Sequence, residues 1–363
     1  MSSETSFSAI PSVQRAFVLP TLGVPLKLIN DHPVVAPSDL LPGQCLIKLT
    51  HSGVCHSDFA IKEGWFAQKT RPKPNLIGGH EGAGTVVAIG EHTLNPPVKV
   101  GDRVGITFLA SACRNCEQCL DGDDSYCTQY KKSGSTVDGT FCEFTVASVD
   151  FVVPIPDALT DAEAAPIMCA GLTVYNALQQ CDARVGSWVV IPGAGGGLGH
   201  LAIQYAATMG LRVLAIDSGE DKRKLVLELG AEKWIDYKES KDLVSDIITA
   251  TEGGAHAAVI TTGSIAVYNQ AIGYLRNRST LVAVGLPKDG VLAVPLVLLA
   301  TKGITVRGIM IGNRQSAKEA VQLAAIGKVK CQYTLRGLSE LEQIYEEMEE
   351  NKIVGRIVLD ISK

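Results

Sequence analysis

The stretch WVVIPGAGGGLGHLAIQYAATMG, residues 188–210, runs from an apolar segment through five glycines into a segment with helical periodicity. Glycines at such a turn let the backbone approach a pyrophosphate, and the following helix points its N-terminus at the anion. The strand, loop and helix together predict a dinucleotide-binding unit, with Gly196, Gly197 and Leu198 at the phosphates. The spacing from Gly193 to Gly199 is one residue longer than in the simplest fingerprint.

Five further apolar segments follow, separated by helical sequence: RVLAID, KWIDY, AAVITTG, STLVAVG and ITVRGIMIG. Alternating strands and helices predict a parallel, doubly wound sheet, and six strands are the full dinucleotide-binding complement. We therefore predict an α/β fold with a cofactor domain over residues 171–311, and we assign Val284 to its site.

Asp217 ends the segment RVLAID, eighteen residues beyond Gly199. An acidic side chain there accepts hydrogen bonds from the adenosine ribose and repels a 2′-phosphate, which predicts NAD rather than NADP. Lys222 and Arg223 are cations close by, so NADP stays open as an alternative. Alternatively, this stretch binds no nucleotide and is only a glycine-rich turn followed by a solvated aspartate.

The first 150 or so residues alternate short β-like runs, such as CLIKLTHSG and AGTVVAIG, with turns that contain Gly and Pro. This pattern predicts an irregular, mostly antiparallel β region. After Gly312, two helical segments lead to a closing strand, GRIVLDIS, and we expect them to return to the first domain. The predicted first domain thus comprises residues 1–170 and 312–363.

Composition narrows the classes of partner. The net charge is −5, with 33 Lys and Arg and no basic run, which argues against nucleic acid. The longest apolar stretch, VLAVPLVLLA at 291–300, is far short of the roughly 20 residues of a membrane span. The N-terminal MSSETSFSAIPSVQRAF lacks the features of a signal peptide, so we expect a cytoplasmic protein.

Four cysteines lie in the sequence ACRNCEQCLDGDDSYC with the spacing C-x2-C-x2-C-x7-C. Four thiolates saturate a tetrahedral zinc ion and leave no open position, which predicts a structural site. An iron–sulfur cluster also takes four cysteines, but its usual CP-terminated run is absent, and a redox dithiol needs only two. The predicted ligands are Cys113, Cys116, Cys119 and Cys127.

A catalytic zinc keeps one position free and takes three protein ligands that can lie far apart in sequence. Candidates are Cys55 and His56 in HSGVCHSDFA, His80 in LIGGHEGAG and Cys169 in APIMCAGLTVYNAL. By spacing alone, each is equally well explained as a core thiol or a hydrogen-bonded histidine.

A family resemblance runs through these motifs. GVCHSD, GGHEGAGTVV, GDRVG, the four-cysteine lobe, AAPIMCAGLTVYNAL, GGLGHLAIQYA, VGLP and NKIVGRIVLD resemble, in order and spacing, the zinc-containing alcohol dehydrogenases of the medium-chain dehydrogenase/reductase superfamily. The likeness is strongest to the yeast and fungal tetrameric branch and covers the chain from about residue 14. It implies a mostly β, GroES-like catalytic domain with a structural zinc lobe, joined to a Rossmann domain.

The resemblance also implies residue roles. Cys55, His80 and Cys169 match the catalytic zinc ligands, Asp58 matches the carboxylate that orients His80, and Glu81 matches an acidic neighbour able to approach the metal. Alternatively, Asp58 and Glu81 are ordinary buried, paired carboxylates.

Further roles concern the proton and the cofactor. Ser57 matches the hydroxyl that accepts the alcohol proton, His56 and Arg356 match the cations at the pyrophosphate, and Lys222 matches the contact to the adenosine ribose. Alternatively, His56 only caps a turn, and Arg356 only belongs to a terminal strand and has no role in binding the cofactor.

Two departures from the family pattern stand out. Ala60 occupies the position of the histidine that usually continues the proton relay, which predicts turnover that is slower near neutral pH and limited by proton release. Yeast-type ethanol enzymes line the substrate pocket with two tryptophans and a methionine, where this chain offers Trp65, Phe108 and Leu286, so that a phenyl ring replaces an indole at position 108. Two extra residues between the first two zinc-ligand candidates, around AQKTRPKPN, also alter the rim of the pocket. Both changes to the pocket predict a primary alcohol or aldehyde bulkier than ethanol.

The sequence therefore predicts a zinc- and NAD-dependent alcohol dehydrogenase with two zinc ions per chain. We expect a homo-oligomer, tetramer or dimer, with VLAVPLVLLA and ITVRGIMIG as contact surfaces, although core packing explains them equally. The alternatives are an NADP-dependent enzyme of fungal specialised metabolism, a polyol, cinnamyl-type or quinone reductase, and a non-catalytic NAD-binding structural protein. Quinone reductases of this fold lack the zinc ligands, and a structural protein has no need of an open metal position.

Overall fold

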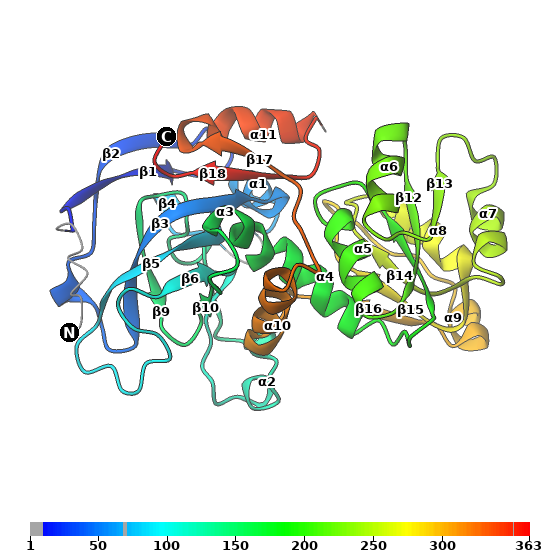
Figure 1. Ribbon diagram of the computed structural model, residues 1–363, viewed down its shortest axis with the longest axis horizontal. Coiled ribbons are helices and arrows are strands. Elements are labelled where there is room, and N and C mark those ends of the chain that lie inside the picture. The colour runs from blue at the N-terminus through cyan, green and yellow to red at the C-terminus, as the bar shows by residue number, and fades with distance from the viewer. Residues whose placement is uncertain (1–9, 68–70, 351) are drawn as a thin grey trace. The chain divides into compact units, whose positions relative to one another are not determined.

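The computed structural model describes residues 10–67, 71–350 and 352–363. This part of the chain forms two compact units (Figure 1). The first unit comprises the described residues up to Cys169 together with Asn313–Ala325 and Tyr333–Lys363. The second unit comprises Ala170–Gly312 and Ile326–Gln332. Residues 1–9 of the N-terminal stretch and residues 68–70 of the AQKTRPKPN segment lie outside the described residues.

The first unit is built on a seven-stranded sheet in the order β10-β6-β5-β3-β18-β17, with β9 also paired to β3. Its pairs are antiparallel except β17 with β18, which confirms the predicted, mostly antiparallel β region. The strands are β3 (Gln44–Val54), β5 (Glu81–Ile89), β6 (Arg103–Ile106), β9 (Phe144–Ser148), β10 (Val153–Pro154), β17 (Tyr333–Gly337) and β18 (Arg356–Asp360).

Smaller elements surround this sheet. A three-stranded sheet has the order β2-β1-β4, and β7 pairs with β8. The strands are β1 (Val13–Leu19), β2 (Lys27–Pro33), β4 (Leu76–Ile77), β7 (Leu109–Ser111) and β8 (Lys131–Lys132). The α-helices are α1 (His56–Lys62), α2 (Glu117–Leu120), α3 (Asp161–Ala164), α10 (Arg314–Ala325) and α11 (Leu341–Glu349). Single 3₁₀ turns are η1 (Pro37–Asp39), η2 (Asp124–Tyr126), η3 (Ala165–Met168) and η4 (Leu338–Glu340).

Strand β3 is central because both of its faces are buried. Cys45, Ile47 and Leu49 point into the main core of the unit, whereas Leu46 packs in a smaller cluster with Phe144. Successive side chains of a strand alternate between the two faces, so this arrangement follows from the apolar run in QCLIKL. The buried strand therefore restricts the position of the residues that follow its end.

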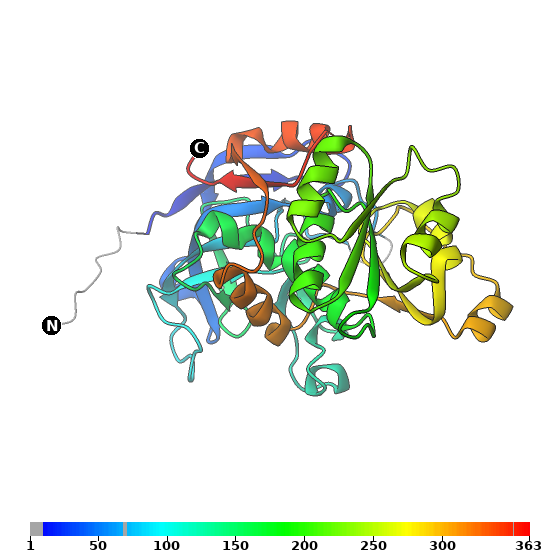
Figure 2. The same ribbon diagram turned by 45° about the vertical axis from the view of Figure 1, so that its right-hand side comes forward.

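The second unit is a six-stranded, all-parallel sheet in the order β13-β12-β11-β14-β15-β16 (Figures 1 and 2). In chain order this is 3-2-1-4-5-6, the doubly wound arrangement of dinucleotide-binding domains, and it confirms the predicted fold class. The strands are β11 (Trp188–Pro192), β12 (Arg212–Asp217), β13 (Lys233–Asp236), β14 (Ala255–Ile260), β15 (Leu275–Ala283) and β16 (Thr305–Gly308).

Helices cover both faces of the parallel sheet. Val190 and Leu214 share one core cluster with residues of α7 and α8, while α5 packs on β11 and β12 and α4 on β14. The helices are α4 (Ala170–Gln179), α5 (Gly199–Thr208), α6 (Glu220–Glu228), α7 (Leu243–Ala250), α8 (Ile265–Tyr274) and α9 (Leu296–Lys302). Within the described ranges, no helix has the length and apolar character needed to cross a membrane.

Two features differ from the sequence-based expectation. Residues 326–332, expected in the first domain, pack with the second unit because Gln204 exchanges two hydrogen bonds with the backbone of Lys330, at 2.9 and 2.8 Å. His200 Nε2 also accepts a hydrogen bond from the backbone of Gln332 at 3.0 Å. Strand β17 was not expected, because YTLRG is short and four of its five residues are half-buried or exposed.

Candidate active site and metal centres

One candidate metal centre lies entirely within the first unit. It comprises Cys55, His80, Glu81 and Cys169, whose potential ligand atoms all lie within 4.8 Å of one another. Cys55 follows the end of β3 and His80 precedes the start of β5, and these two strands pair antiparallel with Gly53 opposite Glu81. The β3–β5 ladder thus brings Cys55 and His80 together, and Cys169 reaches them from the end of η3.

Asp58 orients two parts of this centre. His80 Nδ1 donates a hydrogen bond to Asp58 Oδ1 at 2.7 Å, and both side chains are only 1% exposed. The backbone N–H of Cys55 donates to the other carboxylate oxygen at 2.9 Å. With Nδ1 used as the donor, His80 Nε2 faces Cys169 Sγ at 3.2 Å and presents a lone pair to the centre.

Glu81 and Arg356 form a buried ion pair next to these residues. Burial raises the pKa of Glu81 to about 7, and the positive charge of Arg356 acts against this shift. Glu81 Oε2 has no hydrogen-bond partner among the described residues, so this oxygen is available to a metal ion. A side chain at Gly53 could not be accommodated, because its Cβ would lie 1.9 Å from Glu81 Oε2.

The donor set fits a catalytic zinc ion. Zinc binds thiolate sulfur at roughly 2.3 Å and imidazole nitrogen at roughly 2.0–2.1 Å, so tetrahedral ligand atoms lie about 3–4 Å apart. The distance of 3.2 Å between His80 Nε2 and Cys169 Sγ is in this range. The hydrogen bond from Cys169 and the proximity of His80 and Arg356 lower the pKa of Cys55, which favours its thiolate. Two thiols and one imidazole leave a fourth position for a substrate.

A second candidate centre is the lobe of Cys113, Cys116, Cys119 and Cys127, which also lie within 4.8 Å of one another. Cys113 Sγ and Cys119 Sγ are 3.9 Å apart, close to the spacing of thiolates around tetrahedral zinc. The backbone N–H groups of Cys113 and Gln129 donate to Cys127 Sγ at 3.5 and 3.3 Å, and a backbone hydrogen bond from Asn115 lowers the pKa of Cys113 to about 6. Four thiolates around one ion form a closed, structural site.

The glycine-rich loop lies in the second unit, between β11 and α5. Gly196, Gly197 and Leu198 are half-buried and lead directly into the N-terminus of α5. At Gly199 a Cβ would lie 2.2 Å from the carbonyl oxygen of Gly193, so the helix can begin this close to the strand only with glycine. The loop therefore has the close backbone approach that a dinucleotide pyrophosphate requires.

Asp217 ends β12 and is 7% exposed. Its carboxylate accepts hydrogen bonds from the backbone N–H groups of Gly195 and Ser218, at 3.0 and 2.9 Å. Lys222 Nζ lies 2.8 Å from the same carboxylate and partly neutralises it. The two residues predicted to contact the adenosine ribose thus form one ion pair beside the glycine-rich loop.

Comparisons with known proteins agree with this geometry. Residues 41–157 match the family described as the alcohol dehydrogenase GroES-like domain, and residues 197–325 match the family described as zinc-binding dehydrogenase. An alcohol dehydrogenase of Schizosaccharomyces pombe is 42% identical over 356 residues, which cover 98% of this chain and 99% of that protein. The chain belongs to the zinc-dependent alcohol dehydrogenases of the fungal type.

Solved structures share the fold of this alcohol dehydrogenase. The alcohol dehydrogenase of the archaeon Aeropyrum pernix is 29% identical, with a TM-score of 0.86 over 95% of this chain and 99% of that chain. Acetophenone reductase from Geotrichum candidum, solved in complex with NAD, is 27% identical, with a TM-score of 0.84 over 97% of this chain and 98% of that chain. The predicted family and enzyme class are thereby confirmed.

The other residues predicted to form the site of this alcohol dehydrogenase are divided between the two units. In the first, the ring of Phe108 is 5.1 Å from that of His80, and the ring of the exposed His56 lies 5.5 Å from that of Trp65, tilted by 57°. Ser57 is half-buried in the first turn of α1. In the second, Val284 is buried just after β15, whereas Leu286 is 58% exposed.

Sequence reasoning missed the partners of several residues of this alcohol dehydrogenase. Arg356 was assigned to the pyrophosphate alone, but its side chain is 7% exposed and paired with Glu81. Arg103 received no role, although it stands in the family motif GDRVG and makes an ion pair with Asp161 at 2.6 Å. The motif GDRVG could have indicated that Arg103 has a role, but nothing in the local sequence indicated that its acidic partner is Asp161.

Proposed function

We propose that this alcohol dehydrogenase uses NAD to interconvert a primary alcohol bulkier than ethanol and its aldehyde. The observation that carries the proposal is the convergence of Cys55, His80 and Cys169, within 4.8 Å of one another. Zinc held by these three residues would act as a Lewis acid that polarises the substrate oxygen and lowers the pKa of the alcohol. Asp58 would keep His80 in the required orientation.

Ser57 would accept the proton of the substrate hydroxyl. It lies two residues after Cys55, in the first turn of α1, and is half-buried, which supports this role. General acid–base transfer of this kind requires a group within hydrogen-bond reach. Ala60 offers no side chain that could pass the proton on, so release of the proton to water would limit turnover near neutral pH.

The choice of NAD is supported by Asp217. Its buried carboxylate at the end of β12 would accept hydrogen bonds from ribose hydroxyls and repel a 2′-phosphate. The related acetophenone reductase, solved with NAD, supports the same cofactor. Contacts from His56, Arg356, Lys222 and Val284 to the cofactor stay predictions from the family resemblance.

The preference for a larger substrate is supported by the side chains near the metal ligands. Phe108 is the aromatic side chain whose ring lies 5.1 Å from His80, and a phenyl ring leaves more space than the tryptophan of ethanol enzymes. Acetophenone reductase is by its name a relative that acts on an aromatic ketone. The parts played by Trp65 and Leu286 in the pocket stay sequence-based predictions.

Two zinc ions per chain are proposed, one at the centre of Cys55, His80 and Cys169 and one in the four-cysteine lobe. All ten cysteines are free of disulfides. A cytoplasmic location would suit both sites, because reducing conditions keep the ligand cysteines as thiols.

A homo-oligomer is proposed, with a second copy of the chain on the outer strand of the second unit. Strand β16 ends the parallel sheet, and an edge strand has unpaired backbone groups that can pair with another chain. Val291, Leu296 and Val297 nearby are 75–79% exposed, and a closed symmetric dimer would bury such a surface. Light scattering should show more than one chain per particle, and Val297→Asp should shift it toward the monomer.

The function is tested by zinc analysis and a substrate screen. The purified protein should contain two zinc ions per chain. It should reduce NAD, which is measured by the change in absorbance. Its kcat/KM should be higher for longer or aromatic primary alcohols than for ethanol. A chelator that removes one zinc should abolish activity, and zinc should restore it. A protein that holds only one zinc ion per chain, or that prefers ethanol or NADP, would contradict the corresponding part of the proposal.

A further inference from the structure

The three proposed zinc ligands are not held in the same way. Cys55 and His80 adjoin β3 and β5, whose pairing sets Gly53 opposite Glu81 by backbone hydrogen bonds. Cys169 instead follows α3 and η3, two short helical segments whose backbone hydrogen bonds are local. The contacts that fasten these segments to the sheet therefore decide where Cys169 Sγ lies relative to the other two ligands.

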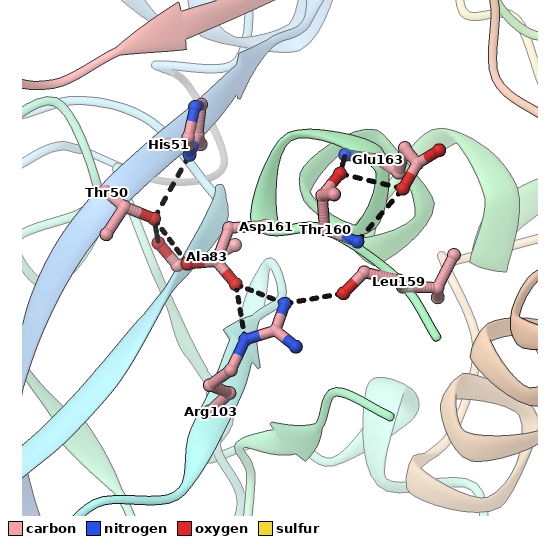
Figure 3. Close-up of polar contacts among 8 residues, drawn as sticks. All are labelled: Thr50, His51, Ala83, Arg103, Leu159, Thr160, Asp161 and Glu163. Carbon is pink, nitrogen blue, oxygen red and sulfur yellow. Dashed lines mark hydrogen bonds and ion pairs between the residues drawn. The ribbon is translucent and has the colours of Figure 1, made fainter. Parts of the chain in front are cut away.

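Asp161, the first residue of α3, makes the polar contacts of this segment with the sheet (Figure 3). Its Oδ2 accepts a hydrogen bond from Thr50 Oγ1 at 2.6 Å. Its Oδ1 accepts two from Arg103, from Nε at 2.9 Å and from Nη2 at 2.6 Å. Arg103 Nη2 also donates to the carbonyl oxygen of Leu159 at 2.6 Å, so the chain is held on both sides of Thr160.

One of these partners lies on β3, the strand that Cys55 follows, and the other lies on β6, which pairs with β5. Thr50 is on β3, five residues before Cys55, and its hydroxyl is also 3.3 Å from the carbonyl oxygen of Ala83 on β5. Arg103 is on β6, where it pairs with Thr85 of β5. One carboxylate therefore joins the Cys169 segment to the framework of Cys55 and His80.

The other end of the segment is held by apolar packing. Met168, the neighbour of Cys169, is 1% exposed and occupies the space left free by Gly105 on β6. A Cβ at Gly105 would lie 2.1 Å from Met168 Sδ. With Asp161 fixed at one end and Met168 at the other, Cys169 has little freedom to move away from the centre.

We propose that Asp161 is a positioning residue of the active site. Through Thr50 and Arg103 it sets the position of Cys169, and thereby the affinity of the centre for zinc. The inference rests on the proposed function, because it takes Cys55, His80 and Cys169 to share one ion. Partners that orient metal ligands typically change metal affinity by about 10–100-fold when they are removed. Asp161 acts through the chain, so we expect the lower end of this range.

The test measures zinc release to a chromophoric chelator from the native holoenzyme, Asp161→Asn and Thr50→Val. One of the two zinc ions should leave Asp161→Asn about tenfold faster than it leaves the native protein, while the second keeps its rate. Thr50→Val should accelerate the same ion less, because the Arg103 pair remains. If Asp161→Asn does not fold, Thr50→Val, which is nearly isosteric, still carries the test.

Glu232→Gln is the matched control, because it breaks a forked ion pair with Arg212 in the second unit, with contacts of 2.6–3.2 Å. Both zinc release rates should stay native in this variant. Native rates in both Asp161→Asn and Thr50→Val would overturn the role of Asp161, as would equal acceleration of both ions, which indicates general loosening. A native protein with a single zinc ion would instead overturn the proposed function, and the role of Asp161 with it.

Discussion

The carboxylate of Asp58 binds the imidazole of His80 and the backbone N–H of Cys55 at once, at 2.7 and 2.9 Å. Two proposed zinc ligands from different chain segments are therefore oriented by one side chain. Because Asp58 is only 4% exposed, solvent does not compete for these hydrogen bonds. The ring of His80 is held with Nε2 directed at the centre before any metal binds.

Replacing Asp58 by Asn should weaken zinc binding at this centre. Asn has nearly the same shape but lacks the charge that strengthens the hydrogen bond from His80. We expect zinc affinity to fall by about 10–100-fold and activity to fall with it, while the zinc of the four-cysteine lobe stays bound. Competition with a chelator measures the affinity, and a native value in Asp58→Asn would contradict the proposed orientation of His80.

Replacing Asp217 by Ser should relax the choice of cofactor. The change removes the charge that repels a 2′-phosphate and frees Lys222, now 2.8 Å from Asp217, to attract it. The ratio of kcat/KM for NADP to that for NAD should rise by about tenfold or more, equivalent to roughly 1.4 kcal/mol. Asp236→Asn is the control, because Asp236 ends the next strand and accepts a backbone hydrogen bond from Gly219 at 2.8 Å. If the ratio of kcat/KM for NADP to that for NAD rises equally in this control, the effect comes from a change in the fold.

Replacing Phe108 by Trp should narrow the space beside His80. The Phe108 ring lies 5.1 Å from the imidazole, so a larger indole would occupy volume next to the proposed metal position. A difference of one methylene in a hydrophobic pocket changes discrimination between substrates by about 10–200-fold. The kcat/KM for bulky alcohols should therefore fall by at least about tenfold relative to that for ethanol. Steady-state kinetics with a homologous series of primary alcohols measures these kcat/KM values. If the variant has the same relative values as the native protein, Phe108 does not line the substrate pocket.

Replacing Ala60 by His should shift the pH–rate profile toward higher rates near neutral pH, because histidine can accept a proton there. Ala60 is 2% exposed, so the larger side chain should also destabilise the fold by about 1–3 kcal/mol. Ala60→Gln separates the two effects, since glutamine adds comparable bulk without titrating. If both variants keep the native profile of kcat against pH, the missing histidine does not limit proton release.

Stability of the second unit should fall at mildly acidic pH because of His256. Its Nδ1 accepts a hydrogen bond from the backbone N–H of Trp188 at 2.9 Å, and Arg276 Nη1 lies 2.9 Å from Nε2. Burial, and then the charge of Arg276, lower the pKa of His256 in the folded protein. The unfolded chain binds a proton near pH 6.5, so the stabilisation is present above about pH 6.5 and is lost as the pH falls below it.

His256→Gln should therefore show a smaller decrease in melting temperature between about pH 7.5 and pH 5 than the native protein. Burial also lowers the pKa of His51, in the first unit, so the variant should keep part of the acid sensitivity. Thermal denaturation over this pH range measures the difference. A decrease identical to the native one would show that His256 does not contribute.

Most of the fold could be predicted from local patterns. The six strands of the parallel sheet, β11 to β16, correspond to segments recognised between turns, and the glycine-rich loop marks the crossover to α5. Strand β17 was not predicted because it is short and its side chains, mostly half-buried or exposed, do not form the buried face of a core strand. Residues 326–332 were placed wrongly because their contacts with His200 and Gln204 join backbone groups to distant side chains.

The site shows the same division. The four cysteines of the lobe lie within one short stretch, so their spacing alone predicted a closed metal site, and the motifs around Cys55, His80 and Cys169 indicated the family. The family resemblance also indicated that Asp58 orients His80, and the structure shows the hydrogen bond between them. Only the tertiary structure shows that Asp161 and Arg103, which lie on separate segments, form an ion pair.

The amino-acid sequence by itself determined the elements whose causes are local: strand and helix periodicity, the glycine-rich turn and the clustered thiols. Only the tertiary structure decided which distant groups meet, such as Glu81 with Arg356 and Asp161 with Thr50 and Arg103. The physical reason is that periodicity and turn chemistry act over a few residues, whereas ion pairs and hydrogen bonds between strands depend on the register that the folded core imposes.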